Sequence, residues 1–111
     1  MATSYTNVGV SPTNTIRNLL YSAPSGVETA IVFAGNASNK DTIARGPVLL
    51  TLELEYSPGQ FRFIGTDIQV PYGISPGIPK IALSANQKLY VTISRANLLD
   101  VHISVIEKGI S

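Results

Sequence analysis

The stretch "VLLTLELEY", residues 48 to 56, decides the fold class of this chain. From Val48 to Tyr56 every second residue is apolar, and the positions between them include Thr51, Glu53 and Glu55. Successive side chains of a β-strand point to opposite faces, so this alternation predicts a half-buried strand with both glutamates on its solvent face. A helix would need apolar residues three to four positions apart.

The same period of two recurs in "KLYVTISR" at 88 to 95 and in "LLDVHISVIE" at 98 to 107, with clusters of Gly, Pro, Asn and Ser between the apolar runs. The strands predicted from this pattern are 15 to 21, 27 to 34, 48 to 56, 60 to 64, 67 to 70, 79 to 83, 88 to 95 and 99 to 107. Each has one apolar face that a second sheet must cover. The predicted fold is therefore all-β: an antiparallel β-sandwich or jelly roll of about eight short strands with minimal helix.

Turn chemistry locates one hairpin and two longer connections. Pro58 and Gly59 occupy the second and third positions that a type II turn prefers, so Ser57 to Gln60 is predicted to be a tight hairpin turn. The connections 36 to 47 and 71 to 79 are longer than a hairpin requires. The glycosylation sequon that begins at Asn36 is interpreted as part of a turn.

The length of 111 residues fits one domain, expected to cover residues 14 to 111. Residues 1 to 13 differ, because they are rich in Ser, Thr and Asn and poor in apolar side chains. Two interpretations remain open for this N-terminal arm. It could be a frayed terminus, or it could become ordered only on assembly, against a neighbouring subunit.

The composition argues against several classes of function. Charged residues make up 14% of the chain, the formal net charge is +1, and the eight Lys and Arg residues are scattered, so no basic surface for direct nucleic-acid binding is expected. No apolar run reaches the roughly 20 residues of a membrane helix. The first residues lack the features of a signal peptide, so synthesis in the cytoplasm is expected. A surface with so few charges is expected to be covered by other molecules.

The sequence contains no recognisable catalytic or metal-binding motif. Asp100, His102 and Ser104 invite a hydrolase interpretation, but same-face neighbours on one strand are about 6.6 to 7 Å apart, whereas a triad needs hydrogen bonds of about 2.6 to 3.2 Å. The pair Glu53 and Glu55 has no His or Asp at ligand spacing. The chain is therefore predicted not to be an enzyme and to have no cofactor and no metal.

Five residues are candidates for contact with a partner protein. Most aromatic residues have the inward parity of their strands and are expected in the core. Tyr90 points outward in the predicted register, His102 lies on the outer face of its strand, and Tyr72, Ile74 and Ile78 lie in the Pro- and Gly-rich loop at 71 to 79. These side chains could be anchors at an interface.

The order of these features resembles a class of small all-β virion proteins of tailed bacteriophages. The resemblance rests on "LLYSAPSGVETAIVFAGNAS" at 19 to 38, "IALSANQKLYVTIS" at 81 to 94 and the closing "LLDVHISVIEKGIS" at 98 to 111. The most similar type is the jelly-roll capsid decoration protein, or cement protein, of epsilon15-like short-tailed phages. The resemblance implies a structural virion protein on the capsid surface that staples major capsid protein subunits, as a homodimer or other homo-oligomer.

Two alternative functions stay open at this stage. The first is an accessory structural protein of the tail or collar. The second is a carbohydrate-binding β-sandwich module, which is disfavoured because the chain has no Trp and its acidic residues are scattered.

Overall fold

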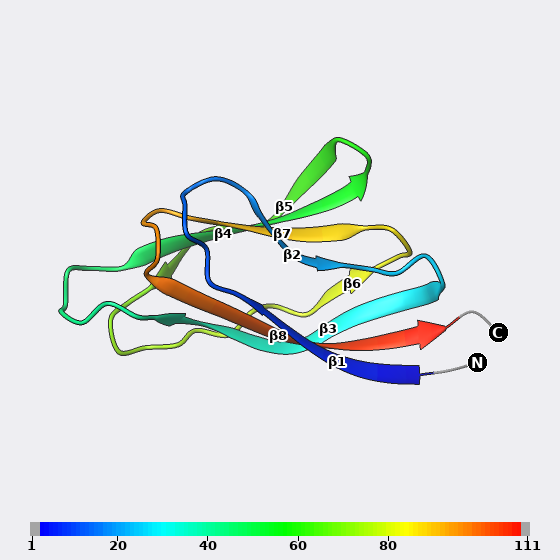
Figure 1. Ribbon diagram of the computed structural model, residues 1–111, viewed down its shortest axis with the longest axis horizontal. Helices are drawn as coiled ribbons and strands as arrows, with labels where there is room; N and C mark the ends of the chain where they lie inside the picture. The colour runs from blue at the N-terminus through cyan, green and yellow to red at the C-terminus, as the bar shows by residue number, and fades with distance from the viewer. Residues whose placement is uncertain (1–2, 110–111) are drawn as a thin grey trace.

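The computed structural model describes residues 3 to 109, which form two antiparallel four-stranded sheets packed face to face, with no helix (Figure 1). The strands are β1 (Thr3–Val10), β2 (Asn18–Ser22), β3 (Val27–Asn39), β4 (Val48–Ser57), β5 (Gln60–Val70), β6 (Ile81–Leu83), β7 (Lys88–Ile93) and β8 (Leu99–Gly109). The predicted arm and domain also include residues 1, 2, 110 and 111, which lie outside the described residues.

The order of the strands is that of a jelly roll. One sheet, named sheet A here, has the order β1-β8-β3-β6, and the other, sheet B, has the order β2-β7-β4-β5. Apart from the hairpin between β4 and β5, each connection carries the chain from one sheet to the other. This arrangement confirms the fold class predicted from the sequence.

The core lies between the two sheets and is built from alternate strand positions. In β4 the residues Val48, Leu50 and Leu52 are fully buried, and the positions between Val48 and Leu52 are only half-buried. The other strands contribute further fully buried aliphatic side chains: Val32, Val70, Leu83, Leu89, Val91, Ile93, Leu99, Val101 and Ile103. Burial of these aliphatic side chains is the main force that holds the sheets together.

Three local predictions of strand position are wrong. The predicted strands omit β1, although Thr3–Val10 pairs along its whole length with β8 and packs Val8 and Val10 against the core. The predicted strands 60 to 64 and 67 to 70 are one continuous strand, β5. The sequon at Asn36 is not a turn, because β3 continues to Asn39 and buries Ala37 completely. Whether the N-terminal arm also orders against a neighbouring subunit stays a prediction.

The predicted hairpin turn at Ser57 to Gln60 is confirmed. Ser57 pairs with Gln60, and Gly59 has a φ of 75°, which the third position of a type II turn requires. The pairing then shifts between Glu55 and Ser57, which leaves Tyr56 as an extra residue on β4. The hairpin projects beyond the rest of the sandwich, at the upper right of Figure 1.

The two ends of the sandwich differ in the length of their connections. The connections 11 to 17, 40 to 47, 71 to 80 and 94 to 98 lie at the left in Figure 1 and form what is named the loop end here. The opposite end has the shorter connections between β2 and β3, β4 and β5, and β6 and β7.

Candidate interaction surfaces

The five residues that the sequence singled out lie on different parts of the molecule. Tyr72 and Ile74 are exposed at the loop end, Tyr90 lies on the outer face of sheet B, and His102 is exposed on the outer face of sheet A. Ile78 is only 8% exposed and belongs to the core. Its backbone N–H donates to the carbonyl of Gly35, which draws this part of the loop against β3, so Ile78 is not retained as an interface residue.

The loop end presents four exposed large apolar side chains: Ile16, Ile43, Tyr72 and Ile74. They come from three separate connections, which hydrogen bonds fix to their neighbours. The N–H of Lys40 donates to the carbonyl of Leu98 at 2.7 Å, and the N–H of Asn97 donates to the carbonyl of Pro12 at 3.0 Å. Exposed apolar side chains on loops that a rigid scaffold holds are typical of binding sites.

Asp41 gives the connection 40 to 47 its shape. Its side chain is almost completely buried, accepts a hydrogen bond from the N–H of Ile43 at 3.3 Å and pairs with Arg45 at 3.3 Å. Arg95 donates to the carbonyls of Gly46 and Pro47 and so fixes the end of the same connection. The exposed Ile43 is therefore presented by a loop with defined internal contacts.

The outer face of sheet B contains a cluster of charged and aromatic side chains. Arg17, next to the start of β2, pairs with Glu53 at 3.0 Å and places its guanidinium over the ring of Phe61 at 3.7 Å from the centroid. The Phe61 ring meets Tyr90 edge-on at 5.7 Å, and the Tyr90 hydroxyl donates to Glu55 at 3.1 Å. This group is named the Arg17 cluster.

The Arg17 cluster corrects the prediction that both glutamates face solvent. Both lie on the outer face of β4, but Glu53 is only 8% exposed. Its cross-strand neighbours are Tyr90 and Phe63, and Arg17 neutralises its charge. A buried carboxylate needs such a partner because isolation from water disfavours its charged form.

Burial and hydrogen bonds shift the pKa values of three residues in the Arg17 cluster: Glu55, Tyr90 and Arg17. The bond from the backbone N–H of Gly59 is the main cause that lowers the pKa of Glu55. Burial, and then the hydrogen bond to Glu55, raises the pKa of Tyr90, and the hydrogen bond to Glu53 raises the pKa of Arg17. At neutral pH all three groups keep the protonation states that these contacts require.

Exposed apolar side chains flank the Arg17 cluster on two strands. Leu19 on β2 lies opposite Tyr90, and Phe63 on β5 lies opposite Glu53. Phe63 is 67% exposed and Leu19 about half exposed. These two side chains expose apolar area that lies outside the connections of the loop end.

The outer face of sheet A is mainly polar, with one aromatic pair. Tyr5 on β1 meets Phe33 on β3 edge-on at 6.4 Å, and both rings are exposed. Elsewhere on this sheet, Ser104 donates to Asn7 at 2.6 Å and Lys40 pairs with Asp100 at 3.2 Å.

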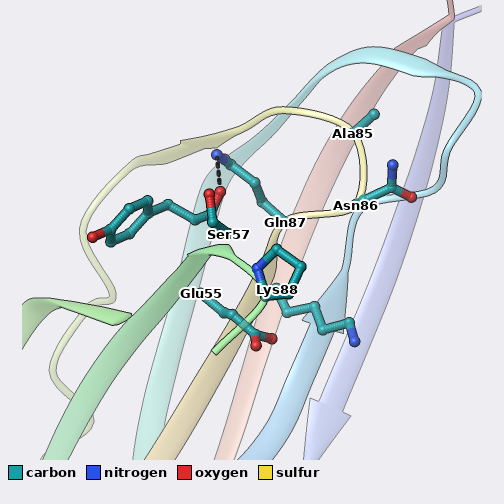
Figure 2. Close-up of a pocket in the computed structure, with 8 residues that line it drawn as sticks. Glu55, Ser57, Ala85, Asn86, Gln87 and Lys88 are labelled. Atoms are coloured by element: carbon teal, nitrogen blue, oxygen red, sulfur yellow. Dashed lines mark hydrogen bonds between the residues drawn. The ribbon is translucent and has the colours of Figure 1, made fainter. Parts of the chain in front are cut away.

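A shallow groove of about 240 Å³ lies where the β4–β5 hairpin meets the turn between β6 and β7 (Figure 2). Glu55 and Lys88 lie at one side of the groove, and Ala85 and Asn86 lie at the other. The amide of Gln87 donates to the carbonyl of Tyr56 at 3.3 Å and so joins the turn to the hairpin. The groove has no nucleophile with an adjacent base, and we assign it no chemistry.

The strand that carries Asp100, His102 and Ser104 does not assemble a catalytic triad. Asp100 is engaged by Ser11 and Lys40, and the Ser11 hydroxyl is the main cause that lowers its pKa. The hydroxyl of Ser104 donates to Asn7 instead of to His102. Within residues 3 to 109 no three His, Cys, Asp or Glu side chains gather as a metal site, and no helix could cross a membrane.

Comparison with solved structures finds other jelly rolls of similar size. The chain aligns over 99% of its length with 88% of a chain from the disulfide-linked pili that form Bacillus endospore appendages, with a TM-score of 0.59 and 14% identity. It aligns over 96% of its length with 87% of a chain from the capsid of Helicobacter pylori bacteriophage KHP30, with a TM-score of 0.57 and 12% identity.

A third similar structure is larger. The chain aligns over 96% of its length with 33% of VP2 from an infectious bursal disease virus subviral particle, with a TM-score of 0.56 and 12% identity. No protein-family model and no curated protein sequence matches the chain. At these identities the comparisons establish a shared fold.

Sequence reasoning missed most of the exposed apolar side chains. The expectation that most aromatic side chains lie in the core is wrong for Phe33 and Phe63, which are exposed, and for Phe61, which lies over Arg17 on the outer face. Arg17 precedes β2, which β7 separates from β4 and its two glutamates, so no sequence pattern marks the contact between Arg17 and Glu53. For Phe61 and Phe63 the misleading factor was the bulge at Tyr56, which no sequence pattern marks.

Proposed function

We propose that this chain is a structural virion protein: a decoration protein that binds major capsid protein subunits on the surface of a phage head and staples them together. The observation that supports this most directly is the exposure of Ile16, Ile43, Tyr72 and Ile74 at one end of a charge-poor jelly roll. When a partner covers such a surface, apolar area is removed from water, and few charged groups lose their favourable hydration. The fold shared with a phage capsid chain is consistent with this function.

In the proposed mechanism the two sheets act as a rigid support and the loop end makes contact with the shell. Loops held by backbone hydrogen bonds lose little conformational entropy on binding. Each contact can be modest, because many copies on one shell would be retained through repeated attachment.

The proposal is tested by adding purified chain to shells of the cognate major capsid protein that lack it, followed by sedimentation and cryo-electron microscopy. We expect saturable binding with many copies per shell and density for the chain on the head. The double variant Tyr72→Ser with Ile74→Ser should lose most of the binding. The matched control, Leu19→Ser with Phe63→Ser, removes two exposed apolar side chains from sheet B and should bind as the wild type does.

Two results would contradict the proposal. If the chain does not bind the shell, it is not a decoration protein. Density on the tail or collar, with the small copy number of a ring, would favour the tail accessory protein instead.

A second candidate function is a subunit that assembles with copies of itself. The specific observation that favours it is the near-complete alignment with a pilus chain, which covers 99% of this chain and 88% of the other. The 111 residues contain no cysteine, so contacts between copies would be noncovalent. Filaments or shells formed by the purified chain alone, seen in negative-stain electron microscopy, would support this function over decoration.

A further inference from the structure

Each sheet of this jelly roll ends in two edge strands, which differ in how far they are protected from pairing with another chain. The edges are β1 and β6 in sheet A, and β2 and β5 in sheet B. An edge strand presents unpaired N–H and C=O groups, and proteins commonly protect it by shortness, charge, proline or a bulge.

Three of the four edges carry such protection. β6 has only three residues and follows Pro79 and Lys80. β2 has five residues and a shift in pairing register between Leu19 and Tyr21. β5 is longer, but its pairing with β4 shifts at three places, and it carries Arg62 and a strained Asp67 with a φ of 50°.

The fourth edge, β1, has none of these features. Its eight residues, TSYTNVGV, include no charged residue and no proline. They pair with β8 from Thr3 to Val10 without a register shift, so the strand is regular along its whole length. Within residues 3 to 109 no strand pairs with its other edge.

We propose that β1 pairs antiparallel with β1 of a second copy of this chain across a two-fold axis. The pairing would join the two four-stranded sheets A into one continuous sheet. It does not depend on what the loop end binds, because the loop end and the outer edge of β1 are separate surfaces. Strand addition at an exposed edge is a common mode of protein association.

The residue pattern of β1 suits pairing with itself. Side chains that lie opposite each other in antiparallel strands point to the same face of the sheet. Two-fold pairing of β1 with itself must therefore place one residue directly opposite the same residue of the second copy, with the axis between the two. With the axis at Asn7, Tyr5 lies opposite Gly9 of the second copy, and Thr6 lies opposite Val8 of that copy. Tyr5 is 73% exposed, and an aromatic ring over a glycine on a neighbouring strand is a stabilising cross-strand pair.

Charge also favours a second copy as the occupant. A strand without charges meets no like charge when it pairs with itself, whereas a charged partner strand would find no complement on it. One strand pair is small beside the roughly 800 Å² per partner of a standard interface, so we expect a weak dimer.

The test is sedimentation equilibrium of the full chain and of two lysine variants over about 1 µM to 1 mM, the range of a weak dimer. Asn7→Lys places two lysines opposite each other at the axis and should raise the dimer Kd at least about tenfold. Gln69→Lys adds the same charge to an exposed position of β5, the other long edge, and should leave the Kd unchanged. Circular dichroism and thermal melting check that both variants fold.

The pairing register is tested by cross-linking, because the chain has no cysteine of its own. With oxidised glutathione, Asn7→Cys should form a covalent dimer, whereas Gln69→Cys should not. A wild type that stays monomeric, a Kd that Asn7→Lys does not change, or equal cross-linking of both cysteine variants would overturn the inference. If the chain forms the dimer but does not bind capsid shells, the β1 pairing stands and only the proposed decoration function is contradicted.

Discussion

Sheet A and sheet B bury similar inner faces, but their outer faces are stabilised in different ways. Sheet B carries the Arg17 cluster, in which long side chains cover a buried glutamate. In sheet A the strands β3 and β8 approach through Gly35, where an added Cβ would lie 2.6 Å from the carbonyl oxygen of His102. Close backbone contact is therefore critical in sheet A, whereas side-chain contacts are critical on the outer face of sheet B.

The largest effect that this comparison predicts comes from adding one methyl group to each sheet. Gly35→Ala in sheet A meets backbone atoms that cannot move separately, so it should lower the free energy of unfolding by about 3 kcal/mol. Gly65→Ala in sheet B meets the end of the flexible Ile68 side chain at 2.8 Å and should cost about 1 kcal/mol or less. Urea unfolding followed by circular dichroism measures both free energies, and equal losses would contradict the stricter requirement for close backbone contact in sheet A.

The next effect concerns the ion pair of sheet B. Arg17→Ala leaves the carboxylate of Glu53 buried without its donor and should cost about 1 to 2 kcal/mol. Arg62→Ala is the matched control on the same sheet. It removes an exposed guanidinium that lies 4.2 Å from the ring centroid of Tyr56, and it should cost about 0.5 kcal/mol. If both variants unfold at the same urea concentration, the Arg17 cluster contributes no more than an exposed side chain.

A smaller effect concerns the contact between the two sheets. The hydroxyl of Tyr21 on β2 reaches Glu107 on β8, and burial followed by this hydrogen bond raises the pKa of Tyr21. Tyr21→Phe should cost about 1 kcal/mol at neutral pH. Tyr72→Phe, which changes an exposed loop residue, should have no effect on thermal unfolding.

The raised pKa of Tyr21 also sets the pH at which this contact is lost. A raised folded-state pKa means that its stabilisation is complete below the unfolded value of about 10 and is lost as the pH rises through the folded value. The difference in unfolding free energy between wild type and Tyr21→Phe should therefore shrink above about pH 10. A constant difference up to pH 12 would contradict this account.

The smallest predicted effect on the free energy of unfolding comes from one acidic side chain on each sheet. Hydrogen bonds lower the pKa of Asp100 on sheet A, chiefly from Ser11, and of Glu55 on sheet B, chiefly from Gly59. Their stabilisation is present above the unfolded values of about 4 and is lost as the pH falls through the folded values. Asp100→Asn and Glu55→Gln should each make unfolding less dependent on pH between about 5 and 2. A pH profile identical to that of the wild type would contradict the assigned hydrogen bonds.

The faces of β5 illustrate where prediction from the sequence fails. A regular hairpin with Ser57 opposite Gln60 would put Phe61 and Phe63 on the inner face, as predicted. The extra residue Tyr56 shifts the register, so Phe61 lies opposite Glu55 and Phe63 opposite Glu53, on the outer face. A one-residue shift exchanges the two faces of a strand, and nothing in the local sequence marks it.

The prediction missed the N-terminal strand, β1, for a different reason. Residues 3 to 10 have only Val8 and Val10 as clear aliphatic side chains, too few for the alternation that identified the other strands. Their pairing with β8, nearly a hundred residues later, forms the strand. The predicted and observed numbers of strands are both eight, because the prediction omits β1 but divides β5 into two strands.

Most of the strands and the two-layer all-β class follow from the sequence alone, because alternation of apolar residues is a local property of a few consecutive positions. The sequence also located the turn at Pro58 and Gly59 and the exposed Tyr72 and Ile74. The burial of Glu53 under Arg17, the place of Ile78 in the core and the unprotected edge at β1 emerge only from the three-dimensional arrangement. These properties depend on contacts between residues far apart in the chain, and their free energies are small beside the burial that drives the sheets together.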